Sequence, residues 1–99
     1  MPWWAHIAKL QTGFAFFMYH VYILYSKDID QFYIGSTGDI DQRIYKHNKK
    51  HRGFTAQPDD WQLMYSESYQ TKAEGLKREL QIKKWKSRKM IEKLIGSVG

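Results

Sequence analysis

Apolar and aromatic positions predict two short strands near the start of the chain. Residues 21–25 and 32–35 are rich in β-branched and aromatic side chains, and the polar segment 26–31 separates them. This pattern is typical of a β-hairpin. Because side chains alternate along a strand, Tyr22 and Tyr33 each face the side opposite to their immediate neighbours. We expect the neighbours, rather than these tyrosines, to face the core.

Helical spacing replaces this alternation after the hairpin. Asp39 is the expected N-cap of a helix that buries Ile40 and Ile44. Arg43 and His47 are four residues apart, so they project from one side of that helix, beside the apolar stripe.

A third strand and two further helices complete the pattern. Residues 61–69 alternate and predict a strand, Thr71 is the expected cap of the second helix, and residues 89–95 predict a short last helix. The predicted fold class is α/β in the α+β sense, with a small three-stranded antiparallel sheet flanked by helices. The side chains expected on one side of the third strand are Leu63, Tyr65, Glu67 and Tyr69.

The second helix carries two apolar stripes. Leu76 and Leu80 lie on one, and Ile82 and Trp85 lie on another, which predicts packing on both sides. Glu79 falls at the edge of the first stripe, where a carboxylate keeps contact with solvent at the rim of a buried surface.

Length and charge narrow the possible partners. Ninety-nine residues form one domain, and a net charge of +6 with a pI near 9.6 suits a polyanion. The basic residues fall into two groups on either side of a nearly neutral stretch, which favours a nucleic-acid footprint over two unrelated solvated helix faces. The residues expected to contact nucleic acid are Lys46, Lys49, Lys50 and Arg52 in the first group, and Lys83, Lys84 and Lys86 in the second.

The chain has no cysteine, which excludes disulfides, cysteine-based zinc sites and cysteine nucleophiles. The apolar run 13–25 is too short to span a membrane. We expect a cytoplasmic protein, as a monomer or a weak dimer.

The chemistry-bearing residues occur in a recognisable order. Tyr22 lies in the string Val-Tyr-Ile, Tyr33 opens Tyr-Ile-Gly, Arg43 and His47 follow on the first helix, and Glu79 lies on the second. This ordered set resembles the GIY-YIG nuclease superfamily, and it is closest to the small stand-alone bacterial members. The resemblance covers residues 19–95. It departs in two places: His20 replaces the first glycine, and no asparagine follows Glu79.

The resemblance implies a role for each matching residue. Arg43 corresponds to the catalytic arginine, and His47 to a histidine present in several branches of the superfamily. Glu79 corresponds to the ligand of one Mg²⁺ or Mn²⁺ ion. The motif tyrosines are Tyr22 and Tyr33, and the structural motif positions are Gly35 and Thr37.

The identity of the general base stays open among Tyr22, Tyr33 and His47. Tyr22 is the favoured base, with Tyr33 positioning it, and this role requires a pKa lowered from about 10 by a cation such as Arg43. His47 either takes the final proton or contacts phosphate.

These implications predict a metal-dependent endonuclease that hydrolyses phosphodiester bonds in DNA and is structure- or damage-directed, as in repair or recombination. RNA stays open as a substrate. The first rival is a non-catalytic nucleic-acid-binding module of the same fold, which the missing asparagine favours. The second is a basic protein-interaction domain that uses exposed aromatic side chains.

Three segments are expected along the chain: an N-terminal extension over residues 1–18, the nuclease-like domain over 19–95, and a tail over 96–99. The extension is aromatic and carries one charged side chain, Lys9. It either packs on the domain or precedes a true start at Met18, and the second alternative is favoured because the site makes no use of the segment.

Overall fold

A three-stranded antiparallel sheet forms the centre of the computed structural model, which describes residues 18–49 and 58–97. The hairpin predicted from the sequence is present, and its second strand lies at one edge because the strand order is β2-β1-β3. The α+β class is therefore confirmed. Residues 1–17 of the expected extension 1–18, together with Lys50 and Arg52, lie outside the described residues. The strands are β1 (Tyr19–Ser26), β2 (Gln31–Thr37) and β3 (Gln62–Tyr69).

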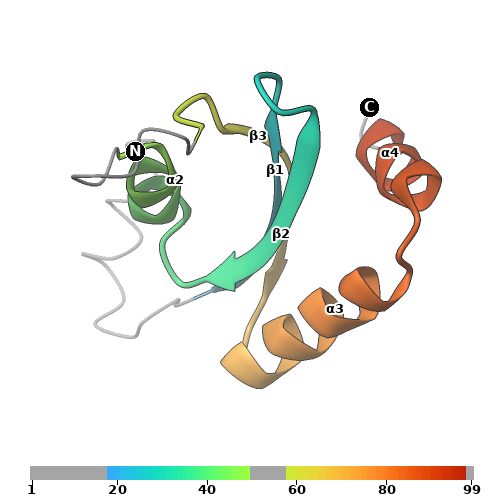
Figure 1. Ribbon diagram of the computed structural model, residues 1–99. Helices are drawn as coiled ribbons and strands as arrows, with labels where there is room; N and C mark the ends of the chain where they lie inside the picture. The colour runs from blue at the N-terminus through green and yellow to red at the C-terminus, as the bar shows by residue number, and fades with distance from the viewer. Residues whose placement is uncertain (1–17, 50–57, 98–99) are drawn as a thin grey trace.

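Helices lie on both faces of the sheet (Figure 1). On one side is α2, and on the other are α3 and α4. The predicted caps are present, since the side chain of Asp39 accepts from the backbone N–H of Gln42, and Thr71 accepts from that of Glu74. The helices are α2 (Ile40–Asn48), α3 (Lys72–Lys84) and α4 (Arg88–Gly96).

The central strand β1 is buried on both faces. Val21, Ile23 and Leu24 are fully buried, and Tyr22 is only 1% exposed. The expectation that Tyr22 lies apart from the core was therefore wrong, because α2 covers the face that the tyrosine occupies.

Packing of α3 also differs from the prediction. Leu76 and Leu80 are 40% and 57% exposed, so the stripe that they form does not face the sheet. The buried residues of α3 are Gly75 and Ile82 instead. A ring carbon of Tyr19 lies 2.6 Å from the position that a Cβ on Gly75 would occupy, so the missing side chain lets the helix approach the first strand.

None of the helices among the described residues is long and apolar enough to cross a membrane.

Candidate active site

On the α2 face, a tyrosine hydroxyl and an imidazole lie together. The hydroxyl oxygen of Tyr22 is 3.3 Å from Nε2 of His47. The ring of Tyr33 stacks beside Tyr22 with a centroid separation of 6.3 Å, and it meets the His47 ring at 4.4 Å. Tyr33 itself is 41% exposed, so this cluster opens to solvent at its outer edge.

The position of Tyr22 depends on the glycine across the strand pair. Tyr22 pairs with Gly35 in the sheet register. A Cβ at Gly35 would lie 2.4 Å from the Tyr22 hydroxyl oxygen, which is a steric overlap. The absence of a side chain at this motif position therefore gives the tyrosine room to reach across β2.

Two side-chain contacts hold α2 where His47 meets the tyrosines. At its start, the hydroxyl of Thr37 accepts from the backbone N–H of Asp39 at 3.1 Å. At its end, Asn48 makes two hydrogen bonds to the backbone of Trp61, at 2.7 and 3.0 Å. The indole of Trp61 then lies 6.2 Å from the His47 ring. Trp61 itself is half-buried.

On the opposite face, α3 brings a carboxylate to β2. Ser36 donates its hydroxyl hydrogen to Oε1 of Glu79, and Lys83 forms a 2.5 Å ion pair with Oε2. The Glu79 side chain is 15% exposed, so the carboxylate lies at the rim of the packed surface as expected. Its neighbours are not Leu76 and Leu80, however, because those side chains face away from the sheet.

Gly35 and Ser36 are consecutive residues of the edge strand β2. They therefore bring the Tyr22–His47 pair and the Glu79 carboxylate to neighbouring positions of this strand. The Tyr22 hydroxyl lies over Gly35 on one face, and Glu79 reaches Ser36 on the other. The charges of Arg43 and Glu79 have smaller and opposite effects on the pKa of Tyr22, since the arginine lowers it and the carboxylate raises it. Arg43 is exposed on α2 and free of the core.

The acid–base properties of Tyr22 contradict one expectation. Burial, followed by Tyr33, raises the pKa of Tyr22 to about 12, and the opposing effect of Arg43 is smaller. Tyr22 is therefore protonated at neutral pH, and the expected cation-lowered pKa was wrong. For His47, burial and then the Arg43 charge lower the pKa below 6.5, so its imidazole is neutral at neutral pH.

The predicted basic residues lie on both sides of the sheet. Lys46 and Lys49 are exposed on or next to α2, and Lys83, Lys84 and Lys86 are exposed at the end of α3 and just after it. Lys83 is additionally the ion-pair partner of Glu79. Sequence reasoning missed the contacts of Ser36 and Asn48, although Ser36 directly follows Gly35 and Asn48 directly follows His47.

Comparison with protein families decides the relationship. Residues 18–93 match the family model described as the GIY-YIG catalytic domain. The chain belongs to the GIY-YIG family. The matched segment contains every described residue of the site above, and the resemblance read from the motifs is confirmed.

Several similar bacterial proteins carry the name UPF0213 protein. One from Staphylococcus saprophyticus is 37% identical over 75 residues, which cover 75% of this chain and 90% of the relative. Another from Staphylococcus epidermidis is 41% identical over 64 residues, covering 64% of this chain and 77% of the relative. A third from Staphylococcus aureus is 36% identical over 72 residues, covering 72% and 87%. No solved structure matches the chain.

Proposed function

We propose that this GIY-YIG chain is a divalent-metal-dependent endonuclease that hydrolyses phosphodiester bonds in DNA, of the structure- or damage-directed kind. One observation carries the proposal. Around the consecutive residues Gly35 and Ser36, a hydrogen-bonded Tyr22–His47 pair lies on one face of β2, and the carboxylate of Glu79 lies on the other. Proton transfer and cation binding, the two requirements of metal-assisted phosphate cleavage, are thus available at one strand edge.

His47 acts as the base in this proposal. Its imidazole is neutral at neutral pH, and in the tautomer that carries its proton on Nδ1, the Nε2 atom accepts from the Tyr22 hydroxyl. Tyr22 takes a proton from the attacking water while it gives its own to His47. A relay of this kind uses a protonated tyrosine, which agrees with its raised pKa. Tyr33 holds both partners through ring contacts.

Arg43 is the proposed phosphate ligand. Its guanidinium is exposed, and it lies one helical turn before His47 on the same side of α2. A guanidinium offers a planar fork of donors to phosphoryl oxygens, and it stabilises the negative charge that develops during cleavage.

Glu79 is the residue that would hold the metal ion, as Mg²⁺ or Mn²⁺. Within the described parts of the chain, no three histidine, cysteine or acidic side chains gather into a ligand group, so an ion here would depend on one carboxylate together with water and substrate oxygens. Mg²⁺ is commonly bound in this way. The Glu79 carboxylate fits a metal ion chemically, because its Oε2 atom already binds a cation, the ammonium group of the half-exposed Lys83 side chain. When bound, the ion supplies Lewis-acid stabilisation of the leaving oxygen.

DNA fits the charge of the surface around the site. Lys46 precedes His47 on α2, and Lys83 pairs with the Glu79 carboxylate, so exposed cations lie on helices that cover both faces of the sheet. Cations spaced in this way neutralise phosphates on either side of the cleaved bond. We propose that the protein acts as a cytoplasmic monomer or weak dimer.

A cleavage assay tests the proposal. Single-stranded, nicked and branched DNA would be incubated with the protein in Mg²⁺, in Mn²⁺ and in EDTA. The matched variants are Glu79→Ala and Glu92→Ala, the latter being an exposed carboxylate of α4. We expect metal-dependent cleavage that Glu79→Ala abolishes and Glu92→Ala preserves, with DNA binding of both within a few-fold of wild type. Cleavage in EDTA, or strong cleavage by Glu79→Ala, would contradict the role of Glu79 as the metal ligand.

The ion pair between Glu79 and Lys83 supports a second candidate, a non-catalytic nucleic-acid-binding module. A carboxylate whose charge is already balanced has less need of a metal ion. In the same assay, this alternative predicts salt-dependent DNA binding without cleavage in any metal.

A further inference from the structure

Helix α3 is attached to the sheet by few apolar contacts. Only Gly75 and Ile82 are buried along its 13 residues, and both leucines of the helix are exposed. Hydrophobic burial is non-directional, so such a small contact leaves the rotation and axial position of a helix weakly specified. Polar contacts must therefore contribute to placing Glu79 opposite Ser36.

Those contacts fall on a single row of the sheet. Val21 on the central strand pairs with Ser36 on one side and with Glu67 on the other. Ser36 binds Glu79, and Glu67 binds Arg78. Two consecutive residues of α3 thus bind the two ends of one row, on opposite outer strands.

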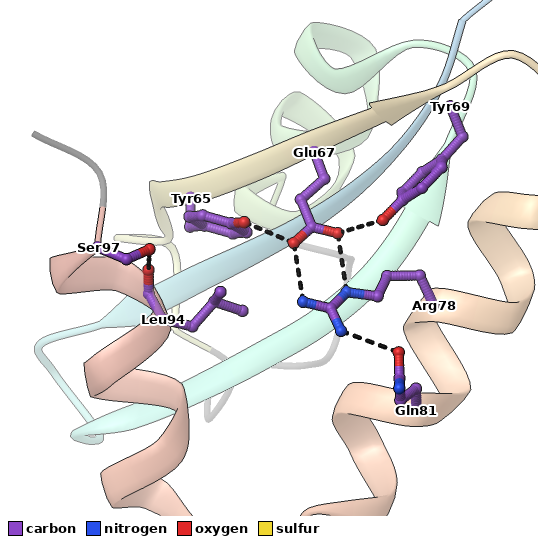
Figure 2. A network of polar contacts seen from close by, with 7 residues as sticks. All are labelled: Tyr65, Glu67, Tyr69, Arg78, Gln81, Leu94 and Ser97. Atoms are coloured by element: carbon purple, nitrogen blue, oxygen red, sulfur yellow. Dashed lines mark hydrogen bonds and ion pairs between the residues drawn. The ribbon is translucent and has the colours of Figure 1, made fainter.

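The Glu67 end of the row is saturated with hydrogen bonds (Figure 2). Its carboxylate accepts from the hydroxyls of Tyr65 and Tyr69 at 2.5 and 2.6 Å. It also accepts from Nε and Nη2 of Arg78, at 2.9 and 3.1 Å. A two-pronged guanidinium contact fixes orientation as well as distance.

Further contacts immobilise the guanidinium itself. Nη1 of Arg78 donates to Oε1 of Gln81 at 2.9 Å, one turn along α3. The Trp85 ring lies 5.5 Å from the guanidinium carbon, within cation–π range. Arg78 therefore contacts Glu67, Gln81 and Trp85 at once, which suits a structural anchor better than a ligand for substrate phosphate.

We propose that Glu67 and Arg78 form a positioning pair that sets the rotation of α3, so that Glu79 meets Ser36 at the edge of β2. The row through Val21 fixes the distance between the two attachment points, and neighbouring helix residues can bind both ends only in one register. Rotating the helix by one residue turns its side chains through about 100° and removes Glu79 from the site. The catalytic consequence rests on the proposed function, but the positioning itself does not.

The test compares Arg78→Lys and Glu67→Gln with Glu92→Gln. Arg78→Lys keeps the positive charge and removes the two-pronged guanidinium contact. Glu67→Gln keeps the shape of the side chain and removes its negative charge. Glu92→Gln breaks an exposed ion pair on α4 as a matched control. The direct readout is the NMR contact between the Ser36 and Glu79 side chains in metal-free protein, with the melting temperature measured alongside.

We expect both α3-anchor variants to lose the Ser36–Glu79 contact while the control retains it. In cleavage assays, we expect the metal concentration for half-maximal rate to rise about tenfold, with much of the maximal rate recovered at saturating metal. A purely stabilising role would lower the melting temperature and leave both the contact and the metal response unchanged, and that result would overturn the proposal.

Two milder variants cover the case in which the anchor variants do not fold. Tyr65→Phe and Tyr69→Phe each remove one donor to Glu67 and leave the fork in place, so a partial weakening of the Ser36–Glu79 contact is expected. An unchanged contact in both would contradict the proposal. If the wild-type protein does not cleave DNA, the proposed function fails, and the NMR measurement still decides the positioning role.

Discussion

The two faces of the sheet hold their functional side chains in different ways. On the α2 face, Tyr22, Tyr33, His47 and Trp61 contact one another through their aromatic rings. On the α3 face, Glu67, Arg78, Glu79 and Lys83 are held by ion pairs and charged hydrogen bonds. Aromatic packing positions one half of the site, and electrostatic pairing positions the other.

This difference matches the chemistry proposed for each half. A proton relay needs partners with low charge, and burial keeps Tyr22 protonated and His47 neutral. A cation site needs a carboxylate held in place, and Ser36 and Lys83 both donate hydrogen bonds to that of Glu79. The edge strand β2 joins the two environments because Gly35 and Ser36 face opposite sides.

The largest effect is expected from Arg43, the proposed phosphate ligand. Arg43→Ala should lower the cleavage rate by about 10²- to 10³-fold, because it removes a preorganised stabiliser of the developing phosphate charge. The comparison is with Gln42→Ala, a change at the exposed neighbouring position. A rate within threefold of wild type would remove Arg43 from the site.

Removing one oxygen from the α2 face isolates its proton chemistry. Tyr22→Phe keeps the ring and its packing but breaks the relay to His47, so we expect a rate loss of about 10²-fold with the melting temperature nearly unchanged. Full activity in this variant would show that the base acts on water without Tyr22.

A methyl group at the junction of the two faces probes the packing of the relay. Gly35→Ala places a Cβ against the hydroxyl and ring of the buried Tyr22, and should cost about 1–3 kcal/mol of folding free energy. At Gly38 the closest atom is 4.0 Å from such a Cβ, so Gly38→Ala is the matched control. Chemical denaturation of both variants provides the measurement, and equal stability would argue against the close approach.

Salt dependence gives the smallest expected effect and involves the exposed lysines. DNA binding should weaken linearly in a plot of log affinity against log salt, and Lys46→Ala should reduce the slope by about one. Lys93→Ala, on the distant helix α4, should leave the slope unchanged. Binding that does not respond to salt would favour the protein-interaction rival.

Local patterns in the sequence predict much of the fold. The hairpin, the caps at Asp39 and Thr71, and the third strand follow from features within a few residues of each other. The side-chain alternation of β3 fails at one point, because the pairing shifts between Ile23 and Leu24 and places Leu63 opposite Leu24 instead of beside Tyr65. A β-bulge of this kind cannot be recognised from the two-residue alternation of side chains in the sequence.

Tertiary contacts account for the errors in the site. The face of α3 that packs is chosen by Tyr19 against Gly75, which are 56 positions apart, and not by the leucine stripe. The motif order singles out Tyr22 and Glu79, but the direction of the tyrosine pKa shift depends on burial by the folded chain. The Ser36–Glu79 bond likewise joins residues 43 positions apart.

The central claim is that the two faces supply separate functions, and single-turnover cleavage measured against both pH and metal concentration tests it most directly. Wild type should lose rate as pH falls through the lowered pKa of His47, because protonation removes the base. His47→Ala should lose this acid limb and keep its metal response within twofold. Glu79→Asp should require more metal and keep the acid limb. An acid limb that persists in His47→Ala, or equal shifts of metal response in both variants, would contradict the division.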